Sequence, residues 1–194
     1  MAALTDPFLL FQEWFDEAER AGVVAPEAMT LATATVDGAP SARMVLLKGA
    51  DEDGFVFYTG YDSRKGAELA ENPRAALVFY WQPVGKQVRV EGLVERVSEA
   101  ESAAYFETRP RGSQLAAWAS QQSRPLASRE ELERRYAELE QEYEGRDVPL
   151  PSQWGGYRLQ PEVIEFWEHH ENRLHDRVRY TRAREGWQTE RLAP

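Results

Sequence analysis

The chain has 194 residues, with 33 acidic against 23 basic side chains, a formal net charge of −10 and no cysteine. Chains of this length typically form one domain of roughly 100–200 residues with its own core, so we expect residues 1–194 to be a single domain. The acidic balance excludes nucleic-acid binding through overall basicity and polybasic attachment to a membrane surface. The lack of cysteine excludes disulfides, thiolate metal sites and cysteine nucleophiles.

The N-terminal segment carries acidic residues where a secretory signal carries basic ones. The longest apolar run, at 75–85, has about half of the roughly 20 residues that span a bilayer. We therefore expect a cytoplasmic protein with neither a membrane nor a nucleic acid as its partner.

The first predicted element is a helix over about 7–21. Asp6 is a suitable N-cap and Pro7 suits the first helical position. Apolar residues then recur at helical spacing from Phe8, while acidic residues occupy the other side. This pattern predicts an amphipathic helix that packs on a core.

The following segments are typical of β-strands, at 30–36, 42–48, 55–59, 75–81 and 87–97. Short turns join neighbouring strands, which predicts antiparallel pairing in a sheet that curls or closes. Helices of about 64–71, 99–108 and 129–144 are predicted to begin after the capping residues Ser63, Ser98 and Ser128. Short strands near 157–159, 163–167, 175–181 and 187–192 complete the same domain. The predicted fold class is mainly β with peripheral helices (α+β).

Several catalytic motifs are absent. The sequence has no GxSxG, no GxxxxGK[ST] and no GxGxxG. Its three histidines, His169, His170 and His175, form either a metal site or a polar turn between strands, and we expect no metal.

Three groups of residues suit anion binding. Ser63, Arg64 and Lys65 stand at a predicted helix start, where free N–H groups favour a phosphate. The alternative is a capped surface helix with two solvated bases. Arg43 and Lys48 bracket the apolar run MVLL; being five residues apart, they face opposite sides of a regular strand or need a bulge between them. Solvated strand ends are the alternative there.

The third group is Tyr105, Arg109 and Ser113, on a predicted helix end and the loop after it. A guanidinium with two hydroxyls matches a phosphate well. Gln121-Gln122-Ser123-Arg124 could form a similar loop. Arg173, His175 and Arg177 alternate on a predicted strand and so share one face, either a ligand face or a solvated one.

Together these groups indicate one or two phosphorylated small ligands rather than a polyanion. No nucleophile accompanies them, which indicates that a cofactor carries the chemistry.

The sequence resembles the pyridoxine/pyridoxamine 5′-phosphate oxidase family over nearly its whole length. The matching motifs are RMVLLK (43–48), VFYTGYDSRKG (56–66), QVRVEG (87–92), YFETRPRGSQ (105–114), AWASQQS (117–123), PLPSQWGGYR (149–158), EFW (165–167) and RLHDR (173–177). At 169–172 the chain has His-His-Glu-Asn, where the family usually has Gly-Gly-x-His.

The resemblance implies an antiparallel, Greek-key-like split β-barrel that binds FMN, and a homodimer with FMN at the subunit interface. The implied FMN contacts are Arg43, Met44, Val45, Leu46, Leu47, Lys48, Tyr58, Thr59, Arg64, Lys65, Gln87, Gln122, Ser123, Trp167 and Arg177. The implied substrate contacts are Lys48, Tyr105, Arg109, Ser113, Arg173 and His175, with the last two as the catalytic pair.

The implied reaction oxidises pyridoxamine or pyridoxine 5′-phosphate with dioxygen to pyridoxal 5′-phosphate and hydrogen peroxide. The amine substrate also releases ammonia. Two alternatives are a related flavin oxidase with another substrate, as in phenazine pathways, and a non-catalytic protein that binds flavin or pyridoxal phosphate. Tyr105, Arg109 and Ser113 favour a phosphorylated substrate, and Arg173 with His175 favours catalysis.

Overall fold

The computed structural model describes residues 6–194; residues 1–5, which the single-domain prediction includes, lie outside this range. The described helices are α1 (Pro7–Arg20), α2 (Arg64–Glu71), α3 (Glu99–Thr108), α4 (Arg111–Ala119) and α5 (Arg129–Glu142), with 3₁₀ turns η1 (Gln82–Val84) and η2 (Glu171–Arg173). The described strands are β1 (Ala28–Ala34), β2 (Pro40–Leu46), β3 (Gly49–Asp51), β4 (Gly54–Gly60), β5 (Arg74–Trp81), β6 (Lys86–Arg96), β7 (Trp154–Glu168), β8 (Asp176–Arg182) and β9 (Trp187–Arg191).

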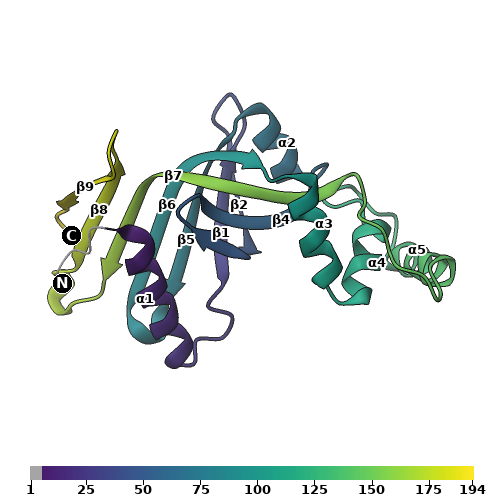
Figure 1. The fold of residues 1–194 in the computed structure, drawn as a ribbon, viewed down its shortest axis with the longest axis horizontal. Coiled ribbons are helices and arrows are strands. Elements are labelled where there is room, and N and C mark those ends of the chain that lie inside the picture. Colours follow the sequence, from purple (N-terminus) through teal and green to yellow (C-terminus); the bar gives the residue numbers. More distant parts are fainter. Residues whose placement is uncertain (1–5) are drawn as a thin grey trace.

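These strands form one antiparallel sheet in the order β2-β1-β5-β6-β7-β4-β3, with β8 and β9 added beside β7 (Figure 1). Different parts of β7 pair with different neighbours: its first half lies against β4 and its second half against β8. The sheet therefore curls around β6 and β7. This arrangement confirms the predicted antiparallel, mainly β fold with peripheral helices.

Two strands predicted at 157–159 and 163–167 are in fact one strand of 15 residues, β7. The apparent break is a β-bulge between β6 and β7, where Gly92 faces Pro161. A Cβ on Gly92 would lie 2.0 Å from the carbonyl oxygen of Gln160, so only glycine allows this close approach of the strands. The proline is tolerated because the ladder is already irregular there.

Helix α1 covers the inner face of the sheet (Figure 1). It begins as predicted, because the Asp6 carboxylate accepts a hydrogen bond from the Phe8 N–H at 2.8 Å. Phe11 and Trp14 are buried, and their rings meet Phe79 and Phe166 edge-on with centroids 5.1 Å apart. Burial of this aromatic cluster fixes α1 on the sheet.

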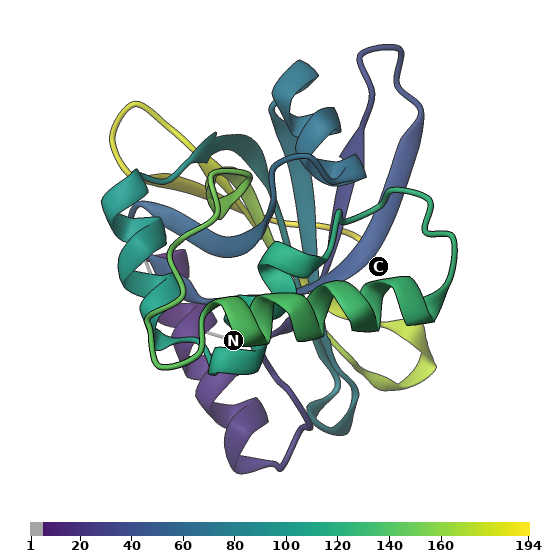
Figure 2. The same cartoon turned by 90° about the vertical axis from the view of Figure 1, so that its right-hand side faces the viewer.

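Helices α3, α4 and α5 lie beyond the edge of the sheet at one end of the long axis, while β8 and β9 lie at the other end (Figures 1 and 2). A second apolar cluster built on Phe106, Leu115 and Trp154 holds these helices together. No helix among the described residues is long and apolar enough to cross a membrane.

The predicted caps are confirmed: the side chains of Ser63, Ser98 and Ser128 each accept a bond from the N–H three residues on. Helix α4 was not predicted, since residues 110–113 were expected to be a loop. Pro110 ends α3 and directly precedes α4, which begins without a side-chain cap. The usual sequence signal for a helix start is therefore missing.

Candidate functional site

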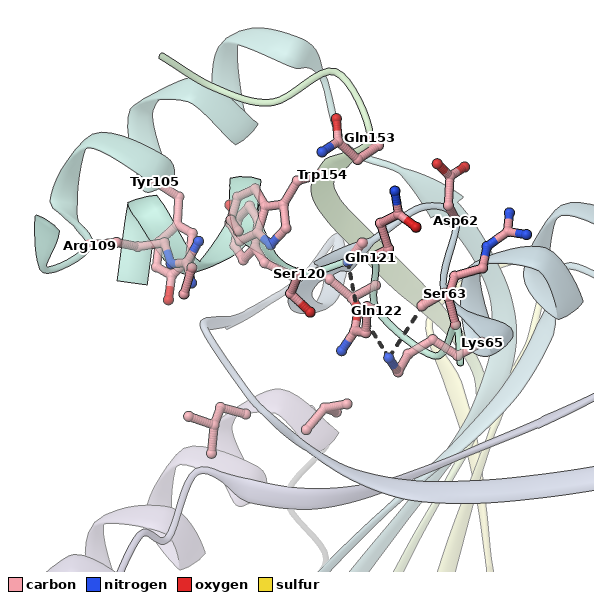
Figure 3. Close-up of a pocket in the computed structure, with 18 of the residues that line it drawn as sticks. Asp62, Ser63, Lys65, Tyr105, Arg109, Ser120, Gln121, Gln122, Gln153 and Trp154 are labelled. Carbon is pink, nitrogen blue, oxygen red and sulfur yellow. Dashed lines mark hydrogen bonds between the residues drawn. The ribbon is translucent and has the colours of Figure 1, made fainter. Parts of the chain in front are cut away.

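A pocket of about 890 Å³ lies between the end of β2, strand β4, the start of α2, helix α4 and the loop after α4 (Figure 3). Among the predicted site residues, those lining it are Met44, Val45, Leu46, Lys48, Tyr58, Thr59, Lys65, Tyr105, Arg109 and Gln122. The structure thus brings members of all three predicted groups into one cavity. Figure 3 shows Lys65 and Arg109 at opposite ends of it.

The Lys65 end is built on the N-terminus of α2. The Ser63 hydroxyl caps the helix, and the Lys65 ammonium donates to Thr59 Oγ1 at 3.0 Å. Lys65 is buried and forms no described ion pair with a carboxylate. Burial, with a smaller effect from the positive charge of Arg43, lowers its pKa from 10.5 to about 8. A helix N-terminus beside an unneutralised cation is an anion site.

Arg43 and Arg64 do not line the pocket; both bind the buried carboxylate of Glu68 instead. The Arg64 guanidinium lies 2.8 Å and the Arg43 guanidinium 3.4 Å from its oxygens. Burial alone raises the pKa of Glu68, but hydrogen bonds from Ser41, Thr33 and Arg64 outweigh it and lower the pKa to about 2. Glu68 is therefore a charged anchor that sets the orientation of both arginines.

Strand β2 leads from Arg43 to the pocket. The strand ends at Leu46, and Leu47, which is buried, and Lys48 have already left it. The Lys48 N–H donates to the Val56 carbonyl at 2.8 Å, and its side chain lines the pocket. From the sequence, Arg43 and Lys48 were expected to face opposite sides of one regular strand or to have a bulge between them. The structure shows neither arrangement, because the strand ends at Leu46, before Lys48, and has no bulge. Met44, with 63% of its surface exposed, gives the pocket an apolar wall.

The Arg109 end combines a cation with aromatic rings. The Arg109 guanidinium lies 4.5 Å from the centre of the Trp154 ring, and its Nη1 is buried without a hydrogen-bond partner. Burial lowers the pKa of Arg109. Ser113, predicted in the same group, stands in the first turn of α4 and is not among the lining residues.

The loop after α4 closes one side of the pocket. The Gln122 side-chain oxygen accepts hydrogen bonds from Thr59 Oγ1 at 2.9 Å and from the Gly60 N–H at 3.2 Å. Ser123 has a positive φ of 69° and lies beside the pocket rather than in its wall. The loop is thus tied to β4 through Gln122.

The remaining predicted residues lie elsewhere. Gln87, Trp167 and Arg177 are direct cross-strand neighbours on β6, β7 and β8. Five strand-to-strand steps separate β2 from β8, which at about 4.8 Å each is roughly 24 Å. Figure 1 shows β8 at the far end of the molecule from α4 and α5. One chain therefore carries two separate groups of predicted site residues.

Arg173 and His175 belong to the second group, but the prediction that they alternate with Arg177 on one strand is wrong. Arg173 lies in η2 with a φ of 61°, Asn172 before it has a φ of 57°, and β8 begins only at Asp176. Two successive left-handed residues turn the chain and break the alternation.

The His175 ring is nevertheless placed beside the row on β6–β8. It lies 4.6 Å from the Trp167 ring, and its Nδ1 accepts a bond from the His170 N–H at 3.2 Å. Burial and the neighbouring His169, His170 and Arg173 lower the pKa of His175.

Gln121 and Arg124, from the loop predicted to resemble an anion site, also line the pocket, whereas the lining residues Ser120 and Trp154 were assigned no role from the sequence. Trp154 is part of the motif PLPSQWGGYR, which carries the family resemblance. No residue pattern in the sequence indicates that it contacts Arg109. That contact joins residues 45 positions apart in the sequence, and local spacing does not reveal it.

Comparisons with known proteins agree with this architecture. A pyridoxamine 5′-phosphate oxidase family model matches residues 15–143, and a model of the pyridoxine 5′-phosphate oxidase C-terminal dimerisation region matches residues 154–194. The pyridoxine/pyridoxamine 5′-phosphate oxidase of Rubrobacter xylanophilus is 64% identical, covering 97% of this chain and 87% of that protein. The protein of the same name from Myxococcus xanthus strain DK1622 is 58% identical, covering 97% of this chain and 92% of that one.

Two solved structures share the fold. PhzG from Burkholderia lata, in complex with tetrahydrophenazine-1-carboxylic acid, is 36% identical with a TM-score of 0.95, over 100% of this chain and 95% of that one. An FMN-binding protein of Nostoc punctiforme related to pyridoxamine 5′-phosphate oxidase is 18% identical with a TM-score of 0.77, over 100% of both chains, and confirms the split-barrel fold. The family models and these relatives show that the chain belongs to the pyridoxine/pyridoxamine 5′-phosphate oxidase family.

Proposed function

We propose that this protein is an FMN-dependent oxidase of pyridoxamine or pyridoxine 5′-phosphate. Dioxygen is the acceptor, and the products are pyridoxal 5′-phosphate and hydrogen peroxide, with ammonia from the amine. The observation that carries the proposal is a single pocket with an anion site at each end, one at Lys65 and one at Arg109. Two phosphorylated ligands, FMN and substrate, match these two sites.

The residues at the Lys65 end fit FMN. Its phosphate would bind the N-terminus of α2 and Lys65, both of which have free donors toward an anion. The exposed Met44 and Leu46 supply an apolar wall for the flavin ring, and Tyr58, Thr59 and Gln122 complete this end.

The residues at the other end fit the substrate phosphate. The buried, unpaired Arg109 Nη1 is a donor that awaits an acceptor, and Tyr105 and Lys48 line the same cavity. Ser113 is included on the family resemblance, and reaches the phosphate if the start of α4 adjusts when the ligand binds.

The second group of residues is proposed to act from a partner subunit. Trp167, Arg173, His175 and Arg177 all lie in the segment that matches the dimerisation region. Roughly 24 Å of sheet separates their row from β2 in one chain. In a homodimer, this second group of residues in one chain reaches the pocket of the other chain, so FMN lies at the interface.

When bound, FMN supplies hydride acceptance and reoxidation by dioxygen. This chain's residues position the reactants. Arg109 and Lys48 hold the substrate phosphate and so fix the distance of C4′ from the flavin. Arg173 and His175 of the partner subunit orient the substrate ring at the reacting carbon. The lowered pKa of His175 favours the neutral imidazole; since its Nδ1 accepts from the His170 N–H, its Nε2 carries the proton and donates a hydrogen bond to the substrate.

A second candidate function is a flavin oxidase with another substrate, because the PhzG structure shares the fold at a TM-score of 0.95. The cationic Arg109 end accepts a carboxylate as well as a phosphate. Binding without turnover is the third possibility.

Oxygen uptake separates these functions. The purified protein is expected to be yellow, to release FMN on denaturation and to consume oxygen with the two phosphorylated vitamers but hardly with pyridoxine or pyridoxamine. Equal rates with and without the phosphate would refute the substrate assignment. A colourless protein that FMN cannot reconstitute would refute the cofactor assignment.

A further inference from the structure

Two aromatic rings lie against the pocket's Arg109, and Trp154 is the nearer of the two. Its ring centre lies 4.5 Å from the guanidinium carbon, and the Phe106 ring lies at 5.5 Å. Arg109 forms no described ion pair with a carboxylate, although 33 acidic residues are present in the chain. Arg109 is half-buried, with its Nη1 fully buried, and a guanidinium taken out of water is usually paired with an acid, so this one is held in an unusual way.

An aromatic ring against Arg109 leaves the N–H donors of the guanidinium available, whereas a carboxylate partner would not. A guanidinium stacked on an indole is oriented by the ring while its N–H donors stay available in its own plane. A carboxylate partner would occupy those donors and cancel the charge. Stacking thus fixes Arg109 without competing with an incoming anion, and the buried, unpaired Nη1 is the donor that remains.

The two glycines that follow Trp154 leave room for neighbouring tyrosine side chains. A Cβ on Gly156 would lie 2.8 Å from the Tyr58 ring, and one on Gly155 would lie 2.0 Å from the Tyr61 hydroxyl. With no side chain at Gly156, the Tyr58 ring lies nearly parallel to Trp154, at 5.5 Å and 14°. The Tyr105 ring stacks on Tyr58 in turn, at 3.9 Å and 20°.

These contacts form an aromatic platform, which we define as Tyr58, Tyr105 and Trp154. Tyr105 and Trp154 are themselves within 8° of parallel. Figure 3 shows Tyr105, Arg109 and Trp154 gathered at one end of the pocket. The platform joins β4, α3 and β7, so the direction of Arg109 depends on segments from three parts of the chain.

We propose that Trp154 is a positioning residue: it holds Arg109 in the direction that binds the substrate phosphate and thereby sets the preference for phosphorylated substrates. This inference rests on the proposed function, since it assigns a role within the same substrate site. Within the Trp-Gly-Gly segment, Gly156 then has a functional reason, because a side chain there would displace the Tyr58 ring of the platform.

The test compares oxygen-uptake kinetics of the FMN-loaded wild type with Trp154→Leu, Trp154→Phe, Arg109→Met and Trp154→Leu/Arg109→Met. Removing a stacking partner of this kind costs roughly three- to thirtyfold in binding. We therefore expect Trp154→Leu to raise KM for pyridoxamine 5′-phosphate by about that factor, with kcat and FMN content little changed. Trp154→Phe keeps a ring face and should restore most of the affinity.

Tyr143→Leu is the matched control. Tyr143 packs in the same apolar cluster as Trp154 and lies 5.7 Å from the Arg146 guanidinium, but it does not line the pocket. General loosening of the cluster would raise KM in this variant too. If Trp154 acts through Arg109, Tyr143→Leu keeps the wild-type KM.

The double variant decides the mechanism. Trp154→Leu should add little in the Arg109→Met background, because the residue that it positions is already gone. Additive effects, an unchanged KM in Trp154→Leu, or an equal rise of KM for unphosphorylated pyridoxamine would each overturn the inference while leaving the oxidase function intact. If Trp154→Leu does not fold, Trp154→Phe takes its place in the cycle: any rise in KM that it causes in the wild type should vanish in the Arg109→Met background, and a rise of equal size in both backgrounds overturns the inference. A wild-type protein that oxidises neither vitamer phosphate would refute the proposed function and the inference with it.

Discussion

Because the pKa of Lys65 is lowered, we expect the apoprotein to lose affinity for FMN as the pH rises. The pKa of Lys65 is lowered from 10.5 to about 8 by burial, with a smaller effect from Arg43. A group with a pKa of about 8 is about 90% protonated at pH 7 and about 10% protonated at pH 9. The FMN phosphate is already dianionic over this range, since its second pKa is about 6.

The bound phosphate stabilises the charged ammonium, so binding raises the pKa of Lys65 and takes up a proton wherever the free lysine is neutral. The expected affinity is about tenfold weaker at pH 9 than at pH 7, with about 0.1 proton taken up per FMN at pH 7 and about 0.9 at pH 9. The decline begins near pH 8, well below the range of an ordinary lysine.

Titration calorimetry of the apoprotein with FMN, in two buffers of different ionisation enthalpy, measures both quantities. Lys65→Arg should bind FMN with a nearly constant affinity from pH 7 to 9, because arginine stays charged. Lys65→Met should bind weakly at both values. A wild-type affinity that is flat over this range, or a proton uptake that persists in Lys65→Met, would refute the placement of the phosphate at Lys65.

Three further predictions follow from other parts of the structure. Glu68→Gln should weaken FMN binding, measured by flavin fluorescence, because it releases Arg43 and Arg64, both FMN contacts on the family resemblance, from their anchor; an unchanged affinity would mean that Glu68 has no part in the site. Phe11→Ala should lower the free energy of unfolding by about 3–5 kcal/mol in denaturant titrations, and a loss under 1 kcal/mol would contradict its place in the core. Lys65→Met and Arg177→Met are each expected to be inactive, but subunits mixed at random should recover about a quarter of wild-type activity, because half of the dimers then have one intact site. No recovery would contradict a site shared between subunits.

The parts of the fold that depend on local chemistry could be predicted from the sequence. Helix α2 has the predicted bounds because Ser63 caps it and Asn72-Pro73 stops it within one short segment. The strands at 75–81 and 87–97 are likewise within one residue of β5 and β6. Each of these signals involves residues within a few positions of one another.

The errors arise where one segment depends on a distant one. The bulge that keeps β7 continuous needs the carbonyl of Gln160 against Gly92, and nothing near residue 161 indicates it. The turn at Asn172 and Arg173 places two residues in the left-handed region, which their sequence alone does not demand. Alternation therefore failed as a guide to the face of Arg173.

The residues of the candidate site also come from distant parts of the chain, so their spacing in the sequence does not reveal their contacts. The charge pairs in the structure distinguish the pocket cations from the other bases. The chain has three lysines. One of them, Lys86, pairs with Glu17 of helix α1 at 2.6 Å. Lys48 and Lys65 both line the pocket, and neither has a described ion pair with a carboxylate.

In a protein with ten more acidic than basic residues, leaving a pocket cation without a carboxylate requires that acids be kept away from it. Glu68, the buried acid closest to this region in the fold, is already saturated by Arg43, Arg64 and two hydroxyls. Arg109 is held by a ring instead of an acid. The pocket cations thus have no described carboxylate partner: the buried Glu68 is bound to other donors, and Asp62, which also lines the pocket, is exposed to solvent.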